Sequence, residues 1–403
     1  MRGQPRDVVS GRTSVLFIER GGEVGGAERV LLDIVHGLDA ARFRPVVVCL
    51  ADGSLPAQLR ASGVTTAVFR VRRLRQVHLV VGALLGLARL VRTERIDVLY
   101  ANGTMMLFYA GPVAWATRRP LVWHVHDPQR RRGAVRSLFV AVLARFRPAW
   151  TIFGTLGVET NHQEVYPNIG RSSTILPAVH VGPIAAARPD RSVLPRVPDG
   201  AVVALVLARY VPGKGLDNLI ASVGGVAASL PALHVVVCGG LEVEGYTAML
   251  ERRRDGLGLG HRVHLLGHVA EDTKRTLLAT CDFLVHPATT EAFGLSVVEA
   301  MAAGKAVVAA DAVGPSHIIA DGVNGLLYPR HDVGALAAAI SRLCLEPHLR
   351  ARLAEAGPAR AADFTVERMV GAVEDVLAEV VADRLNVGGP APPPAPGRDR
   401  RTG

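Results

Sequence analysis

Short apolar segments alternate with longer stretches of helical periodicity through the first part of the chain. The segments are rich in Val, Ile and Leu, which favour strands. Strands that alternate with helices indicate βαβ units and therefore a parallel sheet. The strands predicted in this part lie at 15–18, 45–50, 97–101, 121–124 and 151–153.

A second alternation of the same kind follows a segment without apolar periodicity. Residues 185–200 are rich in Pro, Arg and Asp, which predicts a linker. We therefore predict an α/β fold with two doubly wound, Rossmann-like domains, residues 1–184 and 201–364, facing each other across a cleft. The strands predicted in the second domain lie at 202–208, 234–238, 263–266, 282–286 and 306–310.

The remaining segments flank these domains or stand out by composition. Residues 365–385 have helical periodicity, whereas 386–403 are rich in Pro and Gly and are expected to be disordered. The N-terminal residues lack the apolar core of a signal peptide. Residues 77–91 are the most apolar stretch, but they are too short to span a bilayer, and we predict a buried helix there.

Composition is that of a large soluble enzyme. The chain has 403 residues, of which 49% are hydrophobic and 20% charged. Its four cysteines form no C-x-x-C motif, so reduced thiols and a cytoplasmic location are expected. Acidic residues and histidines do not cluster at metal-ligand spacing, and we expect neither a metal nor another cofactor.

Positive charge is concentrated in the first domain. Residues 1–184 contain 24 arginines against 12 acidic residues, whereas residues 185–403 contain 22 lysines and arginines against 24 acidic residues. Arginines gather at 70–75 and 130–132, and the second group precedes apolar positions on one helical face between Val135 and Phe146. Such a helix either lies on an anionic membrane surface or packs its apolar face into the core.

This charge predicts an anionic partner. The alternatives are the inner face of the plasma membrane, carrying a lipid-linked substrate, and an anionic soluble substrate. Nucleic acid fits less well, because no aromatic residues are interleaved with the arginines.

Two glutamates flank a short loop in the second domain. Glu291 precedes the Ala-Phe-Gly-Leu loop and Glu299 lies in the helix that is predicted to start near Ser296. Both carboxylates can therefore face one cavity at the carboxyl end of a strand. Carboxylates suit sugar hydroxyls, and the free amides at a helix N-terminus suit a diphosphate. Backbone contacts to such a diphosphate ligand are expected from Phe293, Gly294, Leu295 and Ser296.

Two cations flank a Pro-Gly turn after the first strand of the second domain. Arg209 and Lys214 can converge there on one anionic group, the arginine as a planar fork and the lysine as a point charge. The chain contains only three lysines, Lys214, Lys274 and Lys305, and a lysine kept amid so many arginines hints at a chemical requirement.

The first domain offers a glycine-rich loop and a histidine pair. Gly25 and Gly26 begin a helix after the first strand, but the loop is not G-x-G-x-x-G, which disfavours a hydride-transfer enzyme. His124 and His126 lie on the same side of the strand ending at Asp127. His126 could donate a hydrogen bond to a sugar hydroxyl, whereas His124 is better explained as a structural residue.

These motifs, in this order, resemble those of the GT4-type retaining glycosyltransferases, which have the GT-B architecture. The resemblance covers roughly residues 13–383 and implies a metal-independent transfer of a sugar from a nucleotide-diphosphate donor. It assigns Glu291 to the sugar hydroxyls and Glu299 to the ribose.

The resemblance also assigns the other candidates. Arg209 and Lys214 would neutralise the departing diphosphate, and Gly25 and Gly26 would face the diphosphate and the acceptor. His126 would approach the donor sugar, and Asn102 and Asp127 would lie on the acceptor side. In this family an equivalent of the 365–385 helix crosses back to the first domain.

Some positions depart from the family pattern. Ala178 stands where a small or polar residue precedes Gly, His180 where Asp is frequent, and Thr155 where Ser is usual. The segment from Val313 to His317 loses one glycine and the acid of a G-G-x-x-E motif. The nucleotide base, the sugar and the acceptor therefore stay open. A sugar phosphorylase, a nucleotide-sugar epimerase or a catalytically silent scaffold of the same architecture are the alternatives.

Overall fold

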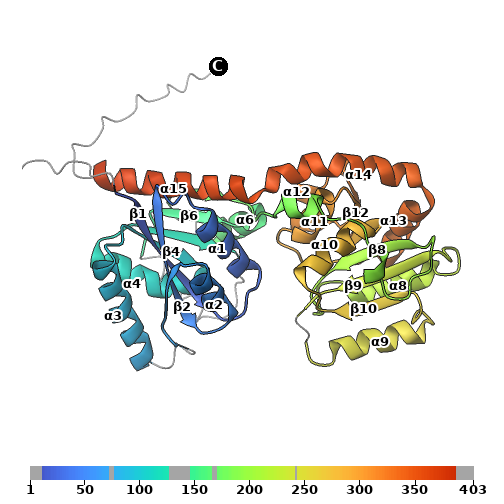
Figure 1. Cartoon of the computed structure of the whole chain (residues 1–403), viewed down its shortest axis with the longest axis horizontal. Helices are drawn as coiled ribbons and strands as arrows, with labels where there is room; N and C mark the ends of the chain where they lie inside the picture. The colour runs from blue at the N-terminus through green and yellow to red at the C-terminus, as the bar shows by residue number, and fades with distance from the viewer. Residues whose placement is uncertain (1–10, 72–76, 127–145, 166–169, 241–242, 387–403) are drawn as a thin grey trace, which may run out of the picture.

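The first sheet contains seven strands, all paired in parallel (Figure 1). The computed structural model describes residues 11–71, 77–126, 146–165, 170–240 and 243–386. The strand order is β3-β2-β1-β4-β5-β6-β7. The strands are β1 (Thr13–Gly21), β2 (Phe43–Ala51), β3 (Thr65–Val68), β4 (Val98–Asn102), β5 (Leu121–Val125), β6 (Trp150–Phe153) and β7 (Ser172–Thr174).

The second sheet contains six parallel strands in the order β10-β9-β8-β11-β12-β13. In each sheet, the strand that comes first in the chain lies in the interior and pairs with the strand that comes fourth. The strand order therefore reverses direction between these two strands. Ligands of doubly wound sheets bind at such a switch point. The strands are β8 (Val202–Leu207), β9 (Leu233–Cys238), β10 (Val263–Gly267), β11 (Phe283–His286), β12 (Ala306–Ala310) and β13 (Leu326–Tyr328).

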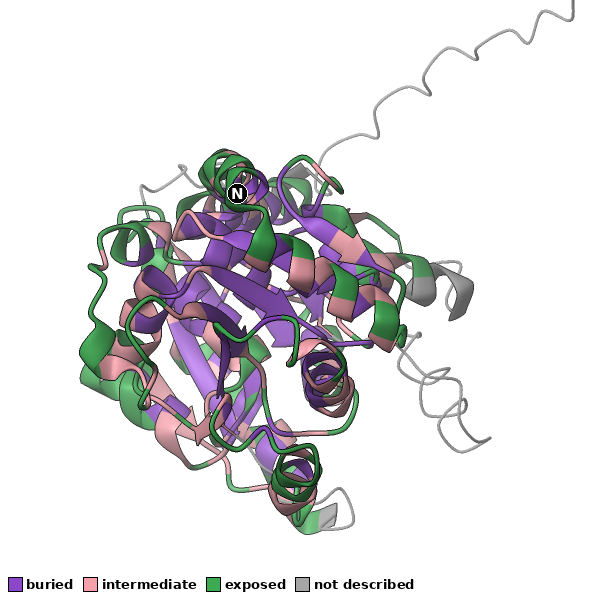
Figure 2. Ribbon diagram, turned by 90° about the vertical axis from the view of Figure 1, so that its right-hand side faces the viewer, coloured by how far each residue is buried: buried purple, intermediate pink, exposed green. Residues whose placement is uncertain are grey.

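Helices cover the sheets, and the interior strands are almost entirely buried, whereas edge strands such as β3 and β7 are only partly buried (Figure 2). Alternate side chains of one strand enter different cores, as Phe17 and Ile18 of β1 do. The helices are α1 (Gly26–Gly37), α2 (Ser54–Ala61), α3 (Val77–Thr93), α4 (Leu107–Thr117), α6 (Leu156–Val165), α7 (Val181–Ala185), α8 (Leu216–Val226), α9 (Tyr246–Gly256), α10 (Glu271–Thr280), α11 (Leu295–Ala302), α12 (Val313–Ile318), α13 (Val333–Leu345), α14 (Pro347–Ala361) and α15 (Val366–Asn386).

The last helix, α15, lies along the first sheet domain, whereas α14 before it lies along the second (Figure 1). Val373 and Leu377 of α15 are buried in the same apolar cluster as residues of α1. Glu374 accepts hydrogen bonds from the Asp39 backbone amide at 2.6 Å and from Arg42 Nη1 at 2.8 Å. The chain therefore crosses between the two sheets a second time, and α15 is anchored by both apolar and polar contacts.

The helix α3 differs from its prediction. It was expected to be buried, but only one stripe of it is: Val80, Ala83 and Leu87 pack into the core. Leu85 is 68% exposed on the opposite side. The prediction was wrong because apolar side chains can remain exposed on the surface of a folded protein, as Leu85 does. No helix among the described residues is long and apolar enough to cross a membrane.

The predicted α/β class with two doubly wound, parallel sheets is confirmed. The domain limits at residues 184 and 201 remain predictions, since short elements such as α7 and the 3-10 turn Arg191–Val193 fill the connection between the sheets. Three predicted features lie outside the described residues: the arginines at 72–75 and 130–132, the apolar positions from 135 to 142, and the tail from residue 387.

Candidate active site

The loop after β11 holds Glu291 and leads directly into α11. This helix begins at Leu295, one residue before the predicted start, and ends at Ala302. Gly294 precedes it with a φ of 106°, in the left-handed region that favours glycine. The Phe293 ring is buried and packs edge-on against Phe364 at 5.4 Å, so this side chain belongs to the core. At Phe293 only the backbone is therefore free to serve a ligand.

Lys214 and Glu291 form a short ion pair between the two strand-end loops. Lys214 Nζ lies 2.6 Å from Glu291 Oε2, and each side chain is 17% exposed. His286 Nε2 lies 3.5 Å from the same oxygen, while His286 Nδ1 bonds Ser296 Oγ at 2.9 Å. Burial alone would raise the pKa of Glu291, but His286 and Lys214 hold it well below its ordinary value. Glu291 is therefore an anion at neutral pH.

The loop after β8 is fixed against the loop after β11. Gly213 O accepts a hydrogen bond from the Thr289 amide at 3.1 Å. Gly215 has a φ of 69°, and a Cβ there would lie 2.0 Å from Pro287 O, so only glycine permits this approach. Arg209, by contrast, is exposed, and its side chain has no hydrogen bond or ion pair to another described residue. The loops thus bring one paired and one free cation to the same edge of the sheet.

Glu299 is held by a second lysine. Lys274 Nζ, on α10, lies 2.7 Å from Glu299 Oε1 and 2.8 Å from Glu271 Oε1. The Glu299 side chain is 15% exposed. Burial raises the pKa of Glu299, against the opposing effect of Lys274. Burial would lower the pKa of Lys274, but Glu299 and Glu271 raise it. Each glutamate of the E-x7-E pair therefore has its own lysine, and Lys274, which stood out in the sequence only as one of three lysines, is the partner of Glu299.

The glycine-rich loop opens α1 in the first domain. Gly25 and Gly26 are both exposed, and the Gly25 amide donates to Glu28 Oε2 at 3.1 Å. Positive φ angles occur earlier in the loop, at Gly21 and Gly22, rather than at Gly25. Gly25, the residue before α1, therefore has an extended backbone that does not require glycine.

His126 lies at the carboxyl end of β5, beside His124. The two rings are 4.0 Å apart, which confirms that they lie on one side of the strand. His124 is buried and bonds Tyr100 Oη through Nδ1 at 2.7 Å, as expected of a structural residue. His126 Nε2 lies 2.7 Å from Asn102 Oδ1, and burial lowers the pKa of His126 to about 4. Asp127 lies outside the described residues.

Sequence reasoning missed one buried acid near His126. Glu19, in β1, is 3% exposed and accepts a short hydrogen bond from Asn102 Nδ2. Burial raises its pKa to about 7, with Glu28 adding to the shift and Asn102 opposing it. Its only signal in the sequence was a single acid directly after the apolar run from Val15 to Ile18.

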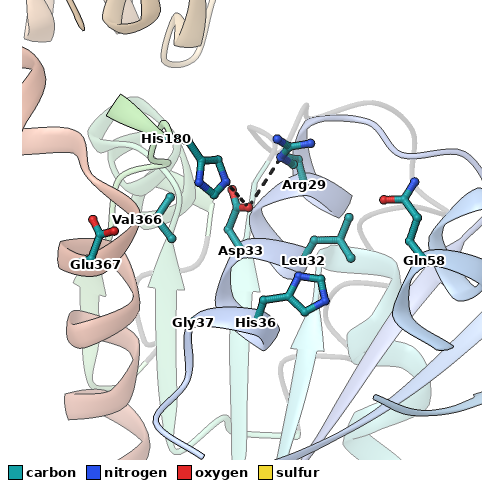
Figure 3. A pocket seen from close by; sticks show the side chains of 9 residues that line it. All are labelled: Arg29, Leu32, Asp33, His36, Gly37, Gln58, His180, Val366 and Glu367. Carbon is teal, nitrogen blue, oxygen red and sulfur yellow. Dashed lines mark hydrogen bonds and ion pairs between the residues drawn. The ribbon is translucent and has the colours of Figure 1, made fainter. Parts of the chain in front are cut away.

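A cavity of about 340 Å³ lies where α1, α15 and the connection between the sheets meet (Figure 3). Asp33 accepts from His180 Nε2 at 2.9 Å and lies 3.6 Å from Arg29 Nε. His180, a departure from the family pattern, thus has an acidic partner on α1. None of the glutamates and lysines described above lines this cavity. Its lining consists of Arg29, Leu32, Asp33, His36, Gly37, Gln58, His180, Val366 and Glu367.

Among the described residues, no group of three or more His, Cys, Asp or Glu side chains is arranged to hold a metal ion. The candidate site contains two cations, Arg209 and Lys214, and two carboxylates, Glu291 and Glu299, together with the N-terminus of α11. This combination suits a negatively charged ligand that also carries hydroxyls.

Solved structures share this architecture. HepE from Anabaena, in complex with UDP and glucose, matches with a TM-score of 0.78 and 25% identity, covering 91% of this chain and 100% of that one. A glycosyltransferase from Rickettsia africae matches with a TM-score of 0.80 at 15% identity, covering 92% and 99% of the two chains, and so supports the fold alone.

Sequence relatives point the same way. A D-inositol 3-phosphate glycosyltransferase from Mycobacterium tuberculosis is 34% identical over 211 residues, which is 50% of this chain and 43% of that protein. The match thus spans less than half the length of this relative. Residues 192–360 match the family described as glycosyl transferases group 1, and residues 24–155 match glycosyltransferase family 4. With both sheet domains matched in their expected order, the chain belongs to the family 4 (group 1) glycosyltransferases of GT-B architecture.

Proposed function

We propose that this chain transfers a sugar from a nucleotide-diphosphate donor to an acceptor hydroxyl, with retention of the anomeric configuration and without a metal ion. The observation that carries the proposal is the Lys214–Glu291 pair at 2.6 Å, with the exposed Arg209 in the same loop as Lys214. It supports a site in which Glu291, after β11, binds the sugar and the two cations after β8 bind the phosphates. The UDP and UDP-glucose complexes of HepE make UDP the first nucleotide to test.

The residues have separate roles in this proposal. Negative charge builds on the leaving diphosphate, and Arg209, Lys214 and the amides at the start of α11 stabilise it. Glu291 binds hydroxyls of the donor sugar and Glu299 binds the ribose. Family resemblance supports attack by the acceptor on the face that the diphosphate leaves, with a phosphate oxygen taking the proton. No side chain of the protein acts as a nucleophile in this scheme.

The proposed acceptor is a lipid-linked precursor of an envelope glycan, reached at an anionic membrane surface. The excess of arginine in residues 1–184 supports this choice. A soluble phosphorylated acceptor is the second candidate, favoured by the mycobacterial relatives, which are D-inositol 3-phosphate glycosyltransferases. Both acceptors are anionic, so charge alone does not separate them.

Thermal denaturation with nucleotides tests the donor site. UDP and UDP-glucose are compared with GDP, ADP and their sugars; a ligand at a hundred times its dissociation constant stabilises the folded state by about 2.7 kcal/mol. We expect one nucleotide family to raise the Tm of the wild type and to lose this effect in Arg209→Met. EDTA should leave turnover unchanged, because side-chain cations take the place of a metal. The proposal fails if no nucleotide raises the Tm, or if Arg209→Met responds as the wild type does.

A further inference from the structure

Three polar side chains form a continuous hydrogen-bonded chain across the carboxyl ends of three adjacent strands. Glu19 lies on β1, Asn102 ends β4 and His126 follows β5, and these strands are neighbours in the sheet. Glu19 and Asn102 are each only 3% exposed. Buried polar groups are costly unless paired, and here each of the two finds its partners in the other and in nearby groups.

The hydrogen bonds determine the orientation of the Asn102 amide. Its Nδ2 donates to the Glu19 carboxylate and lies 3.4 Å from the Ala27 carbonyl oxygen. Both of these groups are acceptors, so the nitrogen of the amide faces them and its oxygen faces the other way. Glu19 is in turn held by the Arg20 backbone amide at 2.5 Å. The carboxylate thus fixes which end of Asn102 points toward β5.

The amide orientation then determines the tautomer of His126. Asn102 Oδ1 is an acceptor, so His126 Nε2, 2.7 Å away, must carry the hydrogen. In the neutral ring Nδ1 therefore keeps its lone pair. Gly154 lies on the Nδ1 side, where a Cβ would come within 3.5 Å of that nitrogen. A ligand that reaches Nδ1 would therefore meet an acceptor of hydrogen bonds and not the expected donor, because the Nε2 hydrogen is bonded to Asn102.

We propose that Glu19 is a positioning residue that acts through Asn102, holding His126 as the neutral Nε2–H tautomer so that Nδ1 accepts a hydrogen bond from a substrate hydroxyl. The inference rests on the proposed function for its role in transfer. Positive charge develops at the anomeric carbon during transfer, so a neutral acceptor suits this place and an imidazolium would oppose the reaction. Burial of His126 and its lowered pKa agree with a neutral ring.

The groups around Glu19 set the conditions of the test. Glu28 on α1 and the Cys49 thiol on β2 face Glu19, and the Asn102 amide and the Arg20 backbone amide bond it. If the hydrogen bonds that link Glu19, Asn102 and His126 were purely structural, breaking them would lower the stability of the protein without changing the tautomer of His126. The tautomer is therefore the readout that separates positioning from scaffolding.

Nitrogen NMR of protein labelled with 15N-histidine reads the tautomer directly and needs no substrate. The His126 signals are assigned from their loss in His126→Asn. We expect the Nε2–H form in the wild type at pH 7.5 and a changed tautomer population in Glu19→Gln, because a Gln amide nitrogen would confront the donors that now face the carboxylate. Tyr100→Phe is the control, since it removes the neighbouring buried hydrogen bond between Tyr100 and His124 and leaves in place the hydrogen bond that His126 Nε2 donates to Asn102 Oδ1.

Kinetics with the donor identified by thermal denaturation supply the second readout. We expect kcat to fall about tenfold to a hundredfold in Glu19→Gln, with little change in the donor KM, because misplacing a catalytic group by a small distance has this effect. If Glu19→Gln does not fold, the double variant Glu19→Leu/Asn102→Leu removes both buried partners together and leaves neither unpaired.

The outcomes separate this inference from the proposed function. A His126 tautomer and a kcat that are both unchanged in an active Glu19→Gln enzyme overturn the positioning role. A changed tautomer in a protein that turns over no nucleotide sugar supports the hydrogen-bonded chain but removes the proposed function. Equal losses in Glu19→Gln and Tyr100→Phe, with the tautomer intact in both, would assign Glu19 to the scaffold instead.

Discussion

At the scale of single residues, the proposed donor site contains two glutamates, each paired with a lysine. Lys214 and Lys274 are two of only three lysines in the chain, and both contact the E-x7-E pair. A lysine is a compact point charge that one carboxylate can share with a phosphate, whereas arginine would impose a planar fork. This difference is a physical reason for lysine at these two positions in a chain whose other cations are mostly arginine.

We expect Lys214→Ala and Glu299→Ala to remove nearly all transferase activity while the protein remains folded. Lys214 loses its contact with the leaving diphosphate, where a single electrostatic contact is worth about a hundredfold to a thousandfold in rate. Each change removes one partner of a partly buried charge, although His286 still faces Glu291 and Glu271 still pairs with Lys274. A hydrogen bond to a charged group is worth about 1.5–3 kcal/mol of stability. Steady-state turnover of the donor and circular dichroism measure the two effects.

Lys305→Ala is the matched control for these variants. Lys305 donates to the Ala279 carbonyl oxygen at 2.8 Å, at the end of α10, and is the one lysine outside the donor site. Its removal should lower stability by about 1 kcal/mol and leave kcat/KM near the wild-type value. Rates within a few-fold of wild type for Lys214→Ala or Glu299→Ala would contradict the site assignment.

Glu19 should make stability depend on pH between about 4.5 and 7. Its pKa rises from 4.5 to about 7 on folding, so the folded state binds the extra proton in this range. Stability therefore falls as pH rises through the range, and the loss is complete above pH 7. The shift corresponds to roughly 3 kcal/mol. Urea denaturation from about pH 5 to 8 should show this fall in the wild type and a flatter profile in Glu19→Gln.

The exposed acid Asp52 provides the comparison. The hydrogen bond from Arg70 lowers the pKa of Asp52. Asp52→Asn should therefore change the pH dependence of stability only at pH values near or below the ordinary pKa of an aspartate. Between about pH 5 and 8 this variant should follow the wild type. If Glu19→Gln shows the same pH dependence of stability as the wild type over this range, then Glu19 does not hold its proton more tightly in the folded state.

At the scale of elements, close contact between two loops depends on one glycine. Gly215 has a φ of 69° and lies where a Cβ would come to 2.0 Å from Pro287 O. Gly215→Ala should therefore lower the unfolding free energy by about 2 kcal/mol or more and weaken the Tm increase with the donor nucleotide. Chemical denaturation and the thermal assay measure the two effects.

Gly225→Ala is the control in the helix that follows Gly215. A Cβ at Gly225 meets nothing within 4 Å, and alanine is preferred to glycine in a helix by about 1 kcal/mol. This variant should be slightly more stable than the wild type, with unchanged nucleotide binding. If Gly215→Ala behaves in the same way, the loop after β8 is not held by its contact with the loop after β11.

Ten of the strands could be read from the sequence, and the three that could not all lie at sheet edges. The missed strands are β3, β7 and β13, which have only three or four residues each. The β7 sequence Ser-Ser-Thr carries no apolar residue, because an edge strand needs little burial. Interior strands such as β4 are buried at every position and therefore carry a continuous apolar signal.

The residues of the candidate site also fall into two groups, those that sequence motifs identify and those that only the fold brings together. Glu291, Glu299, Arg209 and Lys214 lie in short motifs whose spacing could be recognised, and the fold brings Lys214 and Glu291 together. Glu19 and Asn102 are 83 positions apart, and only the parallel pairing of β1 and β4 makes them neighbours. A lone acid in an apolar strand carries no information about its partner, so this pair could be found only in the folded chain.

At the scale of the whole molecule, the two sheet domains differ in charge although they share a topology. The first carries the whole positive excess, and the second is close to neutral. Net charge does not determine a fold, but it governs association with charged surfaces. This difference is what the proposal of an anionic partner for the first domain rests on.

We expect salt-sensitive binding to vesicles that contain anionic lipid, weakened when Arg130, Arg131 and Arg132 are replaced by Ser. Each cation near such a surface contributes about 1 kcal/mol of binding free energy. Added salt screens this attraction, which at 0.1 M is largely lost beyond about 10 Å. Cosedimentation with anionic and neutral vesicles at low and high salt measures the effect. These arginines lie outside the described residues, so the expectation rests on the sequence.

A triple variant of the second domain removes the same amount of charge elsewhere. Arg252, Arg253 and Arg330 are exposed there, and their replacement by Ser should leave vesicle binding near the wild-type level. Equal weakening in both triple variants would mean that net charge alone drives binding and that no surface of the first domain is specialised for it. Cosedimentation without preference for anionic vesicles at low salt would remove the membrane hypothesis; the positive charge of the first domain would then serve a soluble, phosphorylated acceptor.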